Sequence, residues 1–336
     1  MVGAPGPEAG LGHLHESIRA TALLPDEERL RRLRSDRWIG YTKASQALER
    51  LEALFAWPRR ERMPNLLVIG PTNNGKTMVI EKFRRLHPAV SLPDSEKIPV
   101  LVVQMPSEPS VGRFYVALQA AMGAPVRPRQ RIAELEQATL ALLRAVGVRV
   151  LVIDELHNVL AGRGDTRREF LNLIRFLGNE LRIPLVAVGT RDAYLAIRSD
   201  DQLENRFEPF PLPRWEPGPE ACSLLASFAA ALPLRRPSPI ADEEMASYLL
   251  ARSEGTIGEL AWLLTAAAAV AIESGEESIN RAAPCSQPPT PGPPNGAGRS
   301  NAPRHDATLA PPPRTSRRGS PLLLAVAARR RVRHAP

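Results

Sequence analysis

The sequence predicts an α/β fold with a parallel sheet, followed by a smaller helical domain. Between residues 65 and 212, short and mostly apolar runs alternate with helical stretches. Strands of this kind are buried on both faces, which is typical of parallel sheets covered by helices. After Pro213 the patterns are helical only, so the domain boundary is expected near residues 212–217.

The expected strands are runs of four to six mostly apolar residues at 66–69, 100–104, 149–153, 184–188 and 207–212. Apolar residues at helical spacing predict helices in the first domain at 26–37, 43–55, 76–86, 111–122, 131–146 and 166–181. The second domain is expected to contain helices at 217–232, 242–252 and 257–273. We therefore predict a flexible N-terminus over 1–25, an α/β domain over 26–213 and a helical domain over 214–280.

The C-terminal segment 281–336 differs in composition from the rest of the chain. It contains ten arginines, one acidic residue and twelve of the 34 prolines, so its net charge of +9 exceeds the +8 of the whole chain. Proline runs such as 311–313 exclude helix and central strand, and we predict a disordered basic tail. The tail is either a basic arm for nucleic acid or the product of an altered reading frame or truncated gene end. The first 280 residues are near neutral and give no charge argument for nucleic-acid binding.

The two cysteines, Cys222 and Cys285, form no disulfide framework, which indicates a reducing compartment. The N-terminus lacks the apolar core of a signal peptide. The longest apolar run, 260–272, is shorter than the roughly 20 residues that cross a bilayer. We therefore expect a cytoplasmic protein without a membrane partner.

A phosphate-binding motif follows the first expected strand. Gly70, Pro71, Thr72, Asn73, Asn74, Gly75, Lys76 and Thr77 fit GxxxxGK[ST] and open an expected helix. Glycines allow the backbone to approach a phosphate, and successive N–H groups with the helix N-terminus bind the anion. The sequence therefore predicts an ATP site in which Lys76 contacts the β- and γ-phosphates and Thr77 binds Mg²⁺.

Two carboxylates end the expected strand 149–153. Asp154 and Glu155 follow four apolar residues and should lie at the carboxyl edge of the sheet, where ligands bind in open α/β folds. Asp154 is expected to hold Mg²⁺. Glu155 is expected to be the general base that activates water for attack on the γ-phosphate.

These motifs, with a later strand and a helical lid, resemble the AAA+ ATPases. The resemblance implies that Thr190, after the fourth strand of the fold, senses the γ-phosphate. It also implies an arginine finger that acts on the nucleotide of a neighbouring subunit, and Arg206 in the sequence Asn-Arg-Phe matches best, with Arg191 and Arg198 as alternatives. The chain is therefore expected to form a homo-oligomer in the ATP state.

Within AAA+ ATPases the sequence resembles the TniB family, which is related to TnsC. The resemblance rests on Trp-Ile-Gly-Tyr at 38–41, the run 63–77, Asp-Glu-Leu-His-Asn at 154–158 and the segment 253–260. It implies an ATP-dependent regulator that binds DNA, assembles on it and recruits or activates a transposase, with hydrolysis driving release.

By the same resemblance, Ile39, Gly40 and Tyr41 lie near the adenine. The alternative is that these three residues form a hydrophobic plug between the N-terminal helix and the α/β domain. The family often has a second sensing arginine at the start of the last lid helix, but the stretch 253–260 contains none.

Candidate DNA contacts are arginines near loops, and we expect backbone contacts without sequence preference. The candidates are Arg113, Arg127, Arg129, Arg131, Arg163, Arg167 and Arg168. Each is equally compatible with an ordinary solvated arginine.

The sequence leaves three alternative functions open. Asp-Glu-Leu-His at 154–157 also fits a helicase motif, although a two-lobed helicase needs a second α/β lobe that the helical patterns after Leu212 do not predict. A loader of a replicative helicase would share the nucleotide switch but have a different partner. An altered lid could also leave an interaction protein that binds ATP without hydrolysing it.

Overall fold

The computed structural model describes residues 10–93, 95–126 and 130–280. Residues 1–9 of the predicted flexible N-terminus and the whole predicted tail, 281–336, lie outside the described residues. Among the helices of the described part, none is by itself long and apolar enough to cross a membrane. The helices Glu243–Arg252 and Ile257–Glu273 reach that length and apolar character only as a pair, and the chain bends by 109° between them.

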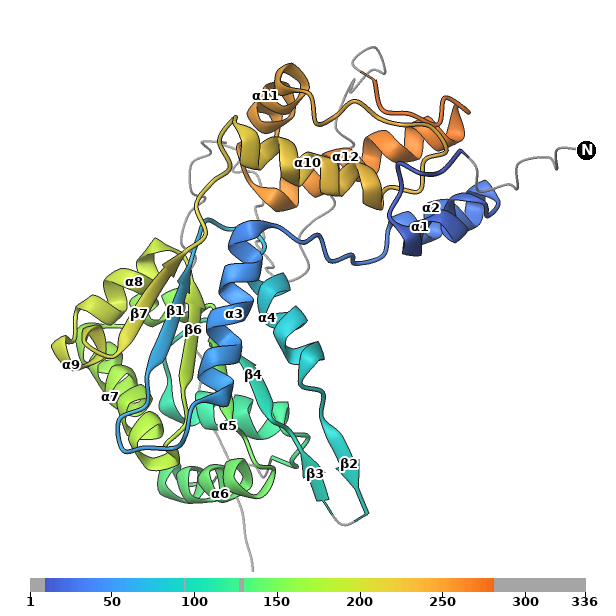
Figure 1. The fold of residues 1–336 in the computed structure, drawn as a ribbon. Helices are drawn as coiled ribbons and strands as arrows, with labels where there is room; N and C mark the ends of the chain where they lie inside the picture. The colour runs from blue at the N-terminus through green and yellow to red at the C-terminus, as the bar shows by residue number, and fades with distance from the viewer. Residues whose placement is uncertain (1–9, 94, 127–129, 281–336) are drawn as a thin grey trace, which may run out of the picture. The chain divides into compact units, whose positions relative to one another are not determined.

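The centre of the fold is a five-stranded parallel sheet (Figure 1). Its order is β4-β5-β6-β1-β7, with bounds β1 Asn65–Ile69, β4 Val100–Gln104, β5 Val150–Asp154, β6 Leu185–Gly189 and β7 Phe207–Pro211. The register pairs Ile69 with Gly189 and Gln104 with Asp154, so the strands end at one common edge. The parallel sheet predicted from the apolar runs is confirmed.

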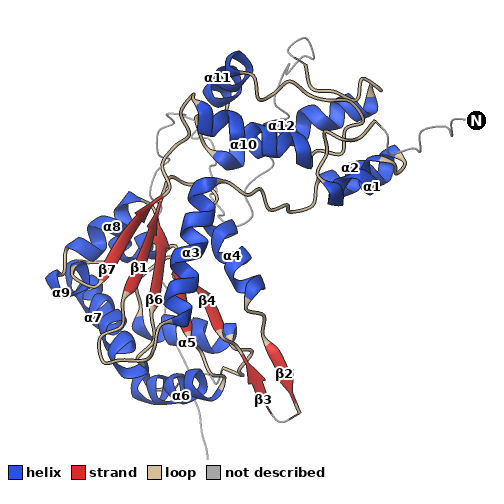
Figure 2. Ribbon diagram, viewed as in Figure 1, coloured by secondary structure: helices blue, strands red, loops and turns tan. Residues whose placement is uncertain are grey.

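Helices cover both faces of this sheet (Figures 1 and 2). Leu66 and Val68 of β1 pack with α3 and α4, whereas Leu67 between them packs with the core under α5, α6, α7 and α8. Successive strand residues point to opposite faces, and a strand covered on both faces is therefore apolar at every position. The bounds are α3 Thr42–Ala56, α4 Lys76–Leu86, α5 Val111–Ala121, α6 Ile132–Ala145, α7 Gly164–Leu181 and α8 Arg191–Arg198.

Several short elements have no counterpart in the prediction. They are the antiparallel pair β2 Val90–Leu92 and β3 Ser95–Lys97, the 3₁₀-helix η1 Leu156–Ala161, and the short helix α9 Asp201–Glu204; α8 was also missed. The strands β2 and β3 are exposed along their length. Exposed three-residue strands and single helical turns bury too few apolar residues to produce a readable period.

The helical unit is larger than predicted. Its lid helices are α10 Pro219–Ala231, α11 Glu243–Arg252 and α12 Ile257–Glu273. Leu33, at the end of α2 (Asp26–Leu33), belongs to the same buried cluster as Leu224 and Leu264 of the lid. The predicted boundary placed α2 in the α/β domain, whereas its apolar side packs on the lid; Trp38 packs on the α/β core, and Tyr41 contacts both clusters.

The N-terminal segment also differs from its prediction. Helix α1 (Glu16–Ala22) lies within the stretch predicted to be flexible. Leu11, Leu14 and Ala22 bury one another, and the His15 N–H donates to the Ala230 carbonyl at the end of α10. These contacts order residues 11–22 through packing that local composition does not reveal.

A buried ion pair joins the N-terminal helices to the end of the lid. Arg29 of α2 is fully buried and donates through both terminal nitrogens to Glu277, at 2.6 and 2.7 Å. The same guanidinium donates to the Pro233 carbonyl at 3.1 Å and to Asp26 at 2.7 Å. Two parallel N–H···O bonds between charged groups are among the strongest side-chain contacts in proteins.

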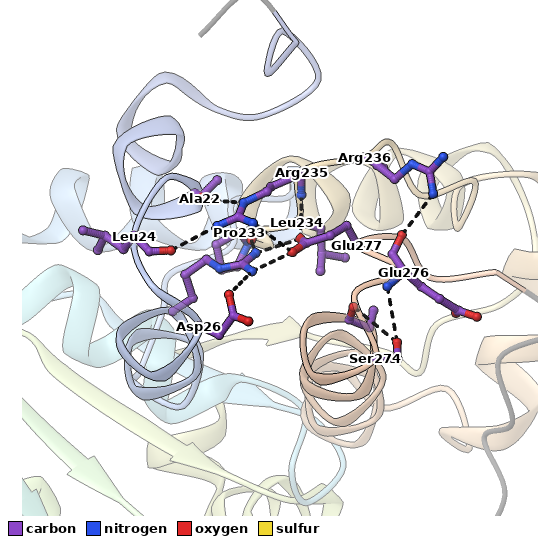
Figure 3. Close-up of polar contacts among 12 residues, drawn as sticks. Ala22, Leu24, Asp26, Pro233, Leu234, Arg235, Arg236, Ser274, Glu276 and Glu277 are labelled. Atoms are coloured by element: carbon purple, nitrogen blue, oxygen red, sulfur yellow. Dashed lines mark hydrogen bonds and ion pairs between the residues drawn. The ribbon is translucent and has the colours of Figure 1, made fainter. Parts of the chain in front are cut away.

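Arg235 completes this network around Glu277 (Figure 3). Its backbone N–H donates to the Glu277 carboxylate at 3.1 Å, and its side chain donates to the carbonyls of Ala22 and Leu24. Burial raises the pKa of Glu277, but the hydrogen bonds from Arg29 and Arg235 outweigh burial, so the pKa lies below its ordinary value. The ionised carboxylate therefore ties residues 22–29 to residues 233–277.

Arg29→Met is expected to destabilise the protein by about 3–5 kcal/mol, because it leaves the buried Glu277 carboxylate without its main partner. Urea unfolding, monitored by circular dichroism, measures this loss of unfolding free energy. Because the folded-state pKa of Glu277 is lowered, the stabilisation is present near neutral pH and should disappear as pH falls through that pKa.

The matched control is Arg84→Met, which removes the exposed ion pair of Arg84 with Glu81. An exposed pair contributes about 0–1 kcal/mol, so this variant should unfold close to the wild type. Equal losses of unfolding free energy in both variants would show that the buried Arg29–Glu277 pair stabilises the fold no more than an exposed ion pair does.

Candidate functional site

The loop Gly70–Thr77 connects β1 to α4 and packs closely on Leu212, just after β7. A Cβ on Gly70 would lie 2.6 Å from the Leu212 carbonyl oxygen, so no larger residue fits there. Gly75 has a φ of 79°, in the left-handed region that favours glycine. Lys76 is the first residue of α4, so the positive end of that helix points into the loop.

Lys76 is held inside this loop. Its Nζ donates to the carbonyls of Gly70 at 3.0 Å and Pro71 at 2.6 Å. Burial lowers the pKa of Lys76, and the carboxylates of Glu155 and Asp154 oppose that shift. The positive charge therefore lies within a backbone loop shaped for an anion.

Asp154 lies at the end of β5 beside the loop. The side chain is buried, and Oδ2 accepts a hydrogen bond from the Thr77 hydroxyl at 3.0 Å. Its Oδ1 accepts from the Glu155 backbone N–H at 2.8 Å. Two residues that are 77 positions apart in sequence thus present a carboxylate and a hydroxyl side by side, as predicted for an Mg²⁺ site.

Glu155 has a left-handed backbone with φ 58° and ψ 34°. This conformation is uncommon for a residue with a side chain and occurs often at functional sites. The Glu155 side chain lines the same cavity as Lys76 and Thr77. Its Oε2 lies 3.1 Å from Nε2 of His157, a residue to which the sequence analysis assigned no role in the site.

Thr190 follows β6 and begins α8. Its hydroxyl accepts a hydrogen bond from the Asp192 N–H at 3.4 Å and caps the helix. Thr190 also lines the cavity with Glu155. The predicted sensor residue thus lies at the same edge of the sheet as the phosphate loop.

The lid contacts the phosphate loop directly. The side chain of Asn74 is buried and donates to the carbonyls of Leu212 at 2.9 Å and Pro213 at 2.8 Å, and its oxygen accepts from the Ile257 N–H at 3.3 Å. The Gly258 N–H donates to the Asn73 carbonyl at 2.9 Å. Two of the free N–H groups that begin α12 are therefore satisfied by the phosphate loop.

A second contact strengthens this junction. The Asn73 side chain donates to Glu259 at 2.8 Å. A Cβ on Gly258 would lie 1.9 Å from Oδ1 and 2.7 Å from the backbone oxygen of Asn73. The two segments approach so closely that glycine is required at 258.

A cavity of about 520 Å³ lies between the phosphate loop and the lid. This volume is in the range of small-molecule sites. Ile39 and Tyr41 line it, whereas Gly40 is not among the lining residues. Tyr41 packs edge-on against Trp215 at 5.2 Å, and burial raises the pKa of Tyr41 to about 12, so the phenol stays neutral.

The sequence analysis missed much of the cavity wall. The missed lining residues include Leu33 and Arg37 from the N-terminal region and Phe228, Leu232, Ala261, Trp262 and Thr265 from the lid. Helices α10 and α12, with Leu232 just after α10, bring the lid side chains to the cavity. No sequence motif marks them, because their pattern is that of ordinary core helices.

Arg206 lies away from this cavity. Its backbone carbonyl accepts from the N–H of Asn65, the first residue of β1, so Arg206 is at the amino edge of the sheet and the phosphate loop at the opposite edge. Its side chain donates to Asn179 at 2.7 Å. Within one chain Arg206 therefore belongs to a different surface from Lys76.

The segments that carry Arg113, Arg131 and Arg163 lie beside one another, because a Cβ on Gly112 would meet Ile132 at 3.9 Å and one on Gly162 would meet Pro109 at 2.3 Å. Arg113 is exposed and lies 3.6 Å from Glu108, and Arg167 and Arg168 line a depression with Asp200. Arg127 and Arg129 lie outside the described residues.

A family model for the bacterial TniB protein matches residues 29–217. The chain belongs to the TniB family. The match covers the phosphate loop, Asp154 and Glu155, Thr190 and Arg206, and it ends where the lid begins. The resemblance inferred from the sequence is thereby confirmed.

Solved structures place this TniB-family chain in the AAA+ fold. The ORC2 protein of Aeropyrum pernix, in ADPNP–ADP complexes, is similar with a TM-score of 0.50 and 15% identity over 74% of this chain and 69% of that chain. Cdc6p from Pyrobaculum aerophilum has a TM-score of 0.49 and 16% identity over 76% and 68%. The likeness to the ORC2 protein concerns the fold alone, which is that of the AAA+ P-loop ATPases. No curated protein matches the sequence.

The residues at the cavity fit a magnesium–nucleotide ligand. Lys76 and the loop N–H groups supply the positive potential that phosphates need. Asp154 and Thr77 supply the hard oxygen ligands that Mg²⁺ prefers. Ile39, Tyr41 and the lid supply apolar walls for a base.

Gly258→Ala is expected to loosen the lid, because the added methyl group cannot fit against Asn73. Hydrogen exchange should rise at residues 257–260 and 212–215, while residues 100–104 of β4 remain protected. Gly112→Ala in α5 is the matched control, since its Cβ would meet its nearest neighbour at 3.9 Å. Unchanged exchange in Gly258→Ala would contradict the inferred docking of α12 on the phosphate loop.

Proposed function

We propose that this member of the TniB family is an ATP-hydrolysing, DNA-binding regulator of transposition. One observation supports the ATPase part most directly. The Thr77 hydroxyl and the Asp154 carboxylate are hydrogen-bonded at 3.0 Å, and Thr77, Lys76 and Glu155 line one cavity. The family membership supports the link to transposition.

The roles of the site residues follow from their positions. Lys76 binds the β- and γ-phosphates from within the loop, and Thr77 with Asp154 holds Mg²⁺. The metal, when bound, neutralises charge on the phosphates during transfer. Glu155 accepts the proton of the attacking water, and Thr190 contacts the γ-phosphate from the end of β6.

Oligomerisation is proposed because Arg206 cannot share a site with Lys76 in one chain. Arg206 lines a depression with Arg60 and Arg62, and no carboxylate among the described residues lines it. Arg60 stacks on Trp57 at 5.1 Å, and Asn179 holds Arg206. Arginines gathered without an acidic partner suit phosphate oxygens, so this surface is proposed to face the nucleotide of a neighbouring copy.

We propose that ATP stabilises the oligomer on DNA, where it recruits or activates a transposase, and that hydrolysis releases it. DNA contacts are expected to be to the backbone and independent of sequence. A two-lobed helicase is disfavoured, because the described residues after β7 contain helices and no second α/β lobe.

The first test is ATP hydrolysis with and without duplex DNA. The wild-type chain should hydrolyse ATP faster with DNA, and Glu155→Gln should bind ATP but lose about 10²- to 10⁴-fold in turnover, the usual contribution of a general base. A chain ending at Asn280 separates the tail from the folded part. DNA binding that is equal with ATP, with ADP and without nucleotide would contradict the proposed switch.

A second test mixes two inactive variants. Lys76→Ala lacks a working phosphate loop, and Arg206→Ala lacks the proposed finger, so each alone should show little turnover. Their mixture should recover activity, because an intact loop then meets an intact Arg206 of another copy. Arg198→Ala is the control, since Arg198 is paired with Glu204 at 2.6 Å and should be dispensable. A mixture as inactive as its components would contradict a role of Arg206 in a neighbouring site.

A further inference from the structure

Glu155 and His157 form a contact that the roles described above do not use. Nε2 of His157 lies 3.1 Å from Oε2 of Glu155. The two atoms are within ion-pair distance, and a carboxylate oxygen favours a ring nitrogen that carries its hydrogen. The Nε2 edge of the histidine therefore faces the carboxylate that is proposed to be the general base.

The left-handed backbone of Glu155 makes this contact possible. Its φ of 58° turns the chain sharply between β5 and η1. While its carboxylate contacts His157, Glu155 still lines the cavity with Lys76 and Thr77. The contact therefore restrains Glu155 in a position that faces the cavity.

The other edge of the His157 ring packs on the end of β6. A Cβ on Gly189 would lie 3.5 Å from Nδ1 and 3.4 Å from the backbone nitrogen of His157. Nδ1 is buried and has no hydrogen-bond partner within the described residues. The ring is thus fixed between Glu155 and the turn that leads to Thr190.

A buried nitrogen without a partner costs stability. A leucine in this place would avoid that cost while filling similar space. The histidine is therefore better explained by its Nε2–H than by packing.

We propose that His157 is a positioning residue for ATP hydrolysis. It orients the Glu155 carboxylate through Nε2–H and links this orientation to the Gly189–Thr190 turn, the segment proposed to sense the γ-phosphate. This inference rests on the proposed ATPase function. It assigns to His157 an effect on turnover rather than on nucleotide binding.

The test compares His157→Leu with His157→Gln in steady-state ATP hydrolysis. His157→Leu removes the donor, and kcat should fall about 10- to 100-fold, as expected when a reacting group is misplaced. KM and the Kd of a fluorescent ATP analogue should stay within about twofold, because the phosphate loop is untouched. His157→Gln places an amide N–H near the position of Nε2 and should recover most of kcat.

His87→Leu is the matched control. His87 also contacts a carboxylate through Nε2, that of Glu52 at 2.9 Å, but it lies at the end of α4 and does not line the cavity. Its loss should leave kcat unchanged. A double variant, His157→Leu with Glu155→Gln, should be no slower than Glu155→Gln alone, since both changes act through one carboxylate.

The outcomes separate the inference from the proposed function. If the wild-type chain hydrolyses ATP and His157→Leu keeps its kcat, the positioning role is wrong while the ATPase function stands. An equal loss of kcat in His157→Leu and His157→Gln would assign His157 to packing and also contradict the role. Absence of hydrolysis by the wild-type chain would contradict both.

Discussion

Parallel pairing of the central strands is the constraint on which the site depends. β1 lies between β6 and β7, and the Gly70 N–H donates to the Gly189 carbonyl at 3.1 Å where β1 and β6 end. Because β5 is also parallel to β6, Asp154 ends at the same edge. This pairing brings the phosphate loop, Glu155 and Thr190 to one cavity, with Asp154 beside Thr77, and it leaves Arg206 at the opposite edge of the sheet.

Asparagine amides connect this edge to the lid. Asn74 satisfies two carbonyls after β7 and one N–H of α12, so three segments meet at one buried side chain. The segment 253–260 has no arginine to sense nucleotide. The contacts of Asn73 and Asn74 instead join the phosphate loop to the first turn of α12 by hydrogen bonds.

The other side of the lid is fixed by charge. Arg29 and Glu277 are 248 residues apart, and their buried pair joins α2 to the chain just after α12. Leu33 and Ile39, which follow Arg29, pack with the lid cluster, and Ile39 also lines the cavity. The N-terminal helices thus position one wall of the cavity, and the Arg29–Glu277 pair stabilises them there.

The sequence by itself determined the α/β fold, the phosphate loop and the Asp154–Glu155 pair. Each is encoded locally: apolar runs give buried strands, and glycines with Lys76 and Thr77 give an anion-binding turn. Tertiary structure alone decided that α1 and α2 pack on the lid, that Gly258 docks on Asn73, and that His157 contacts Glu155. These depend on contacts between distant segments or on a left-handed turn at a residue other than glycine, and hydrophobic periodicity contains no information about either.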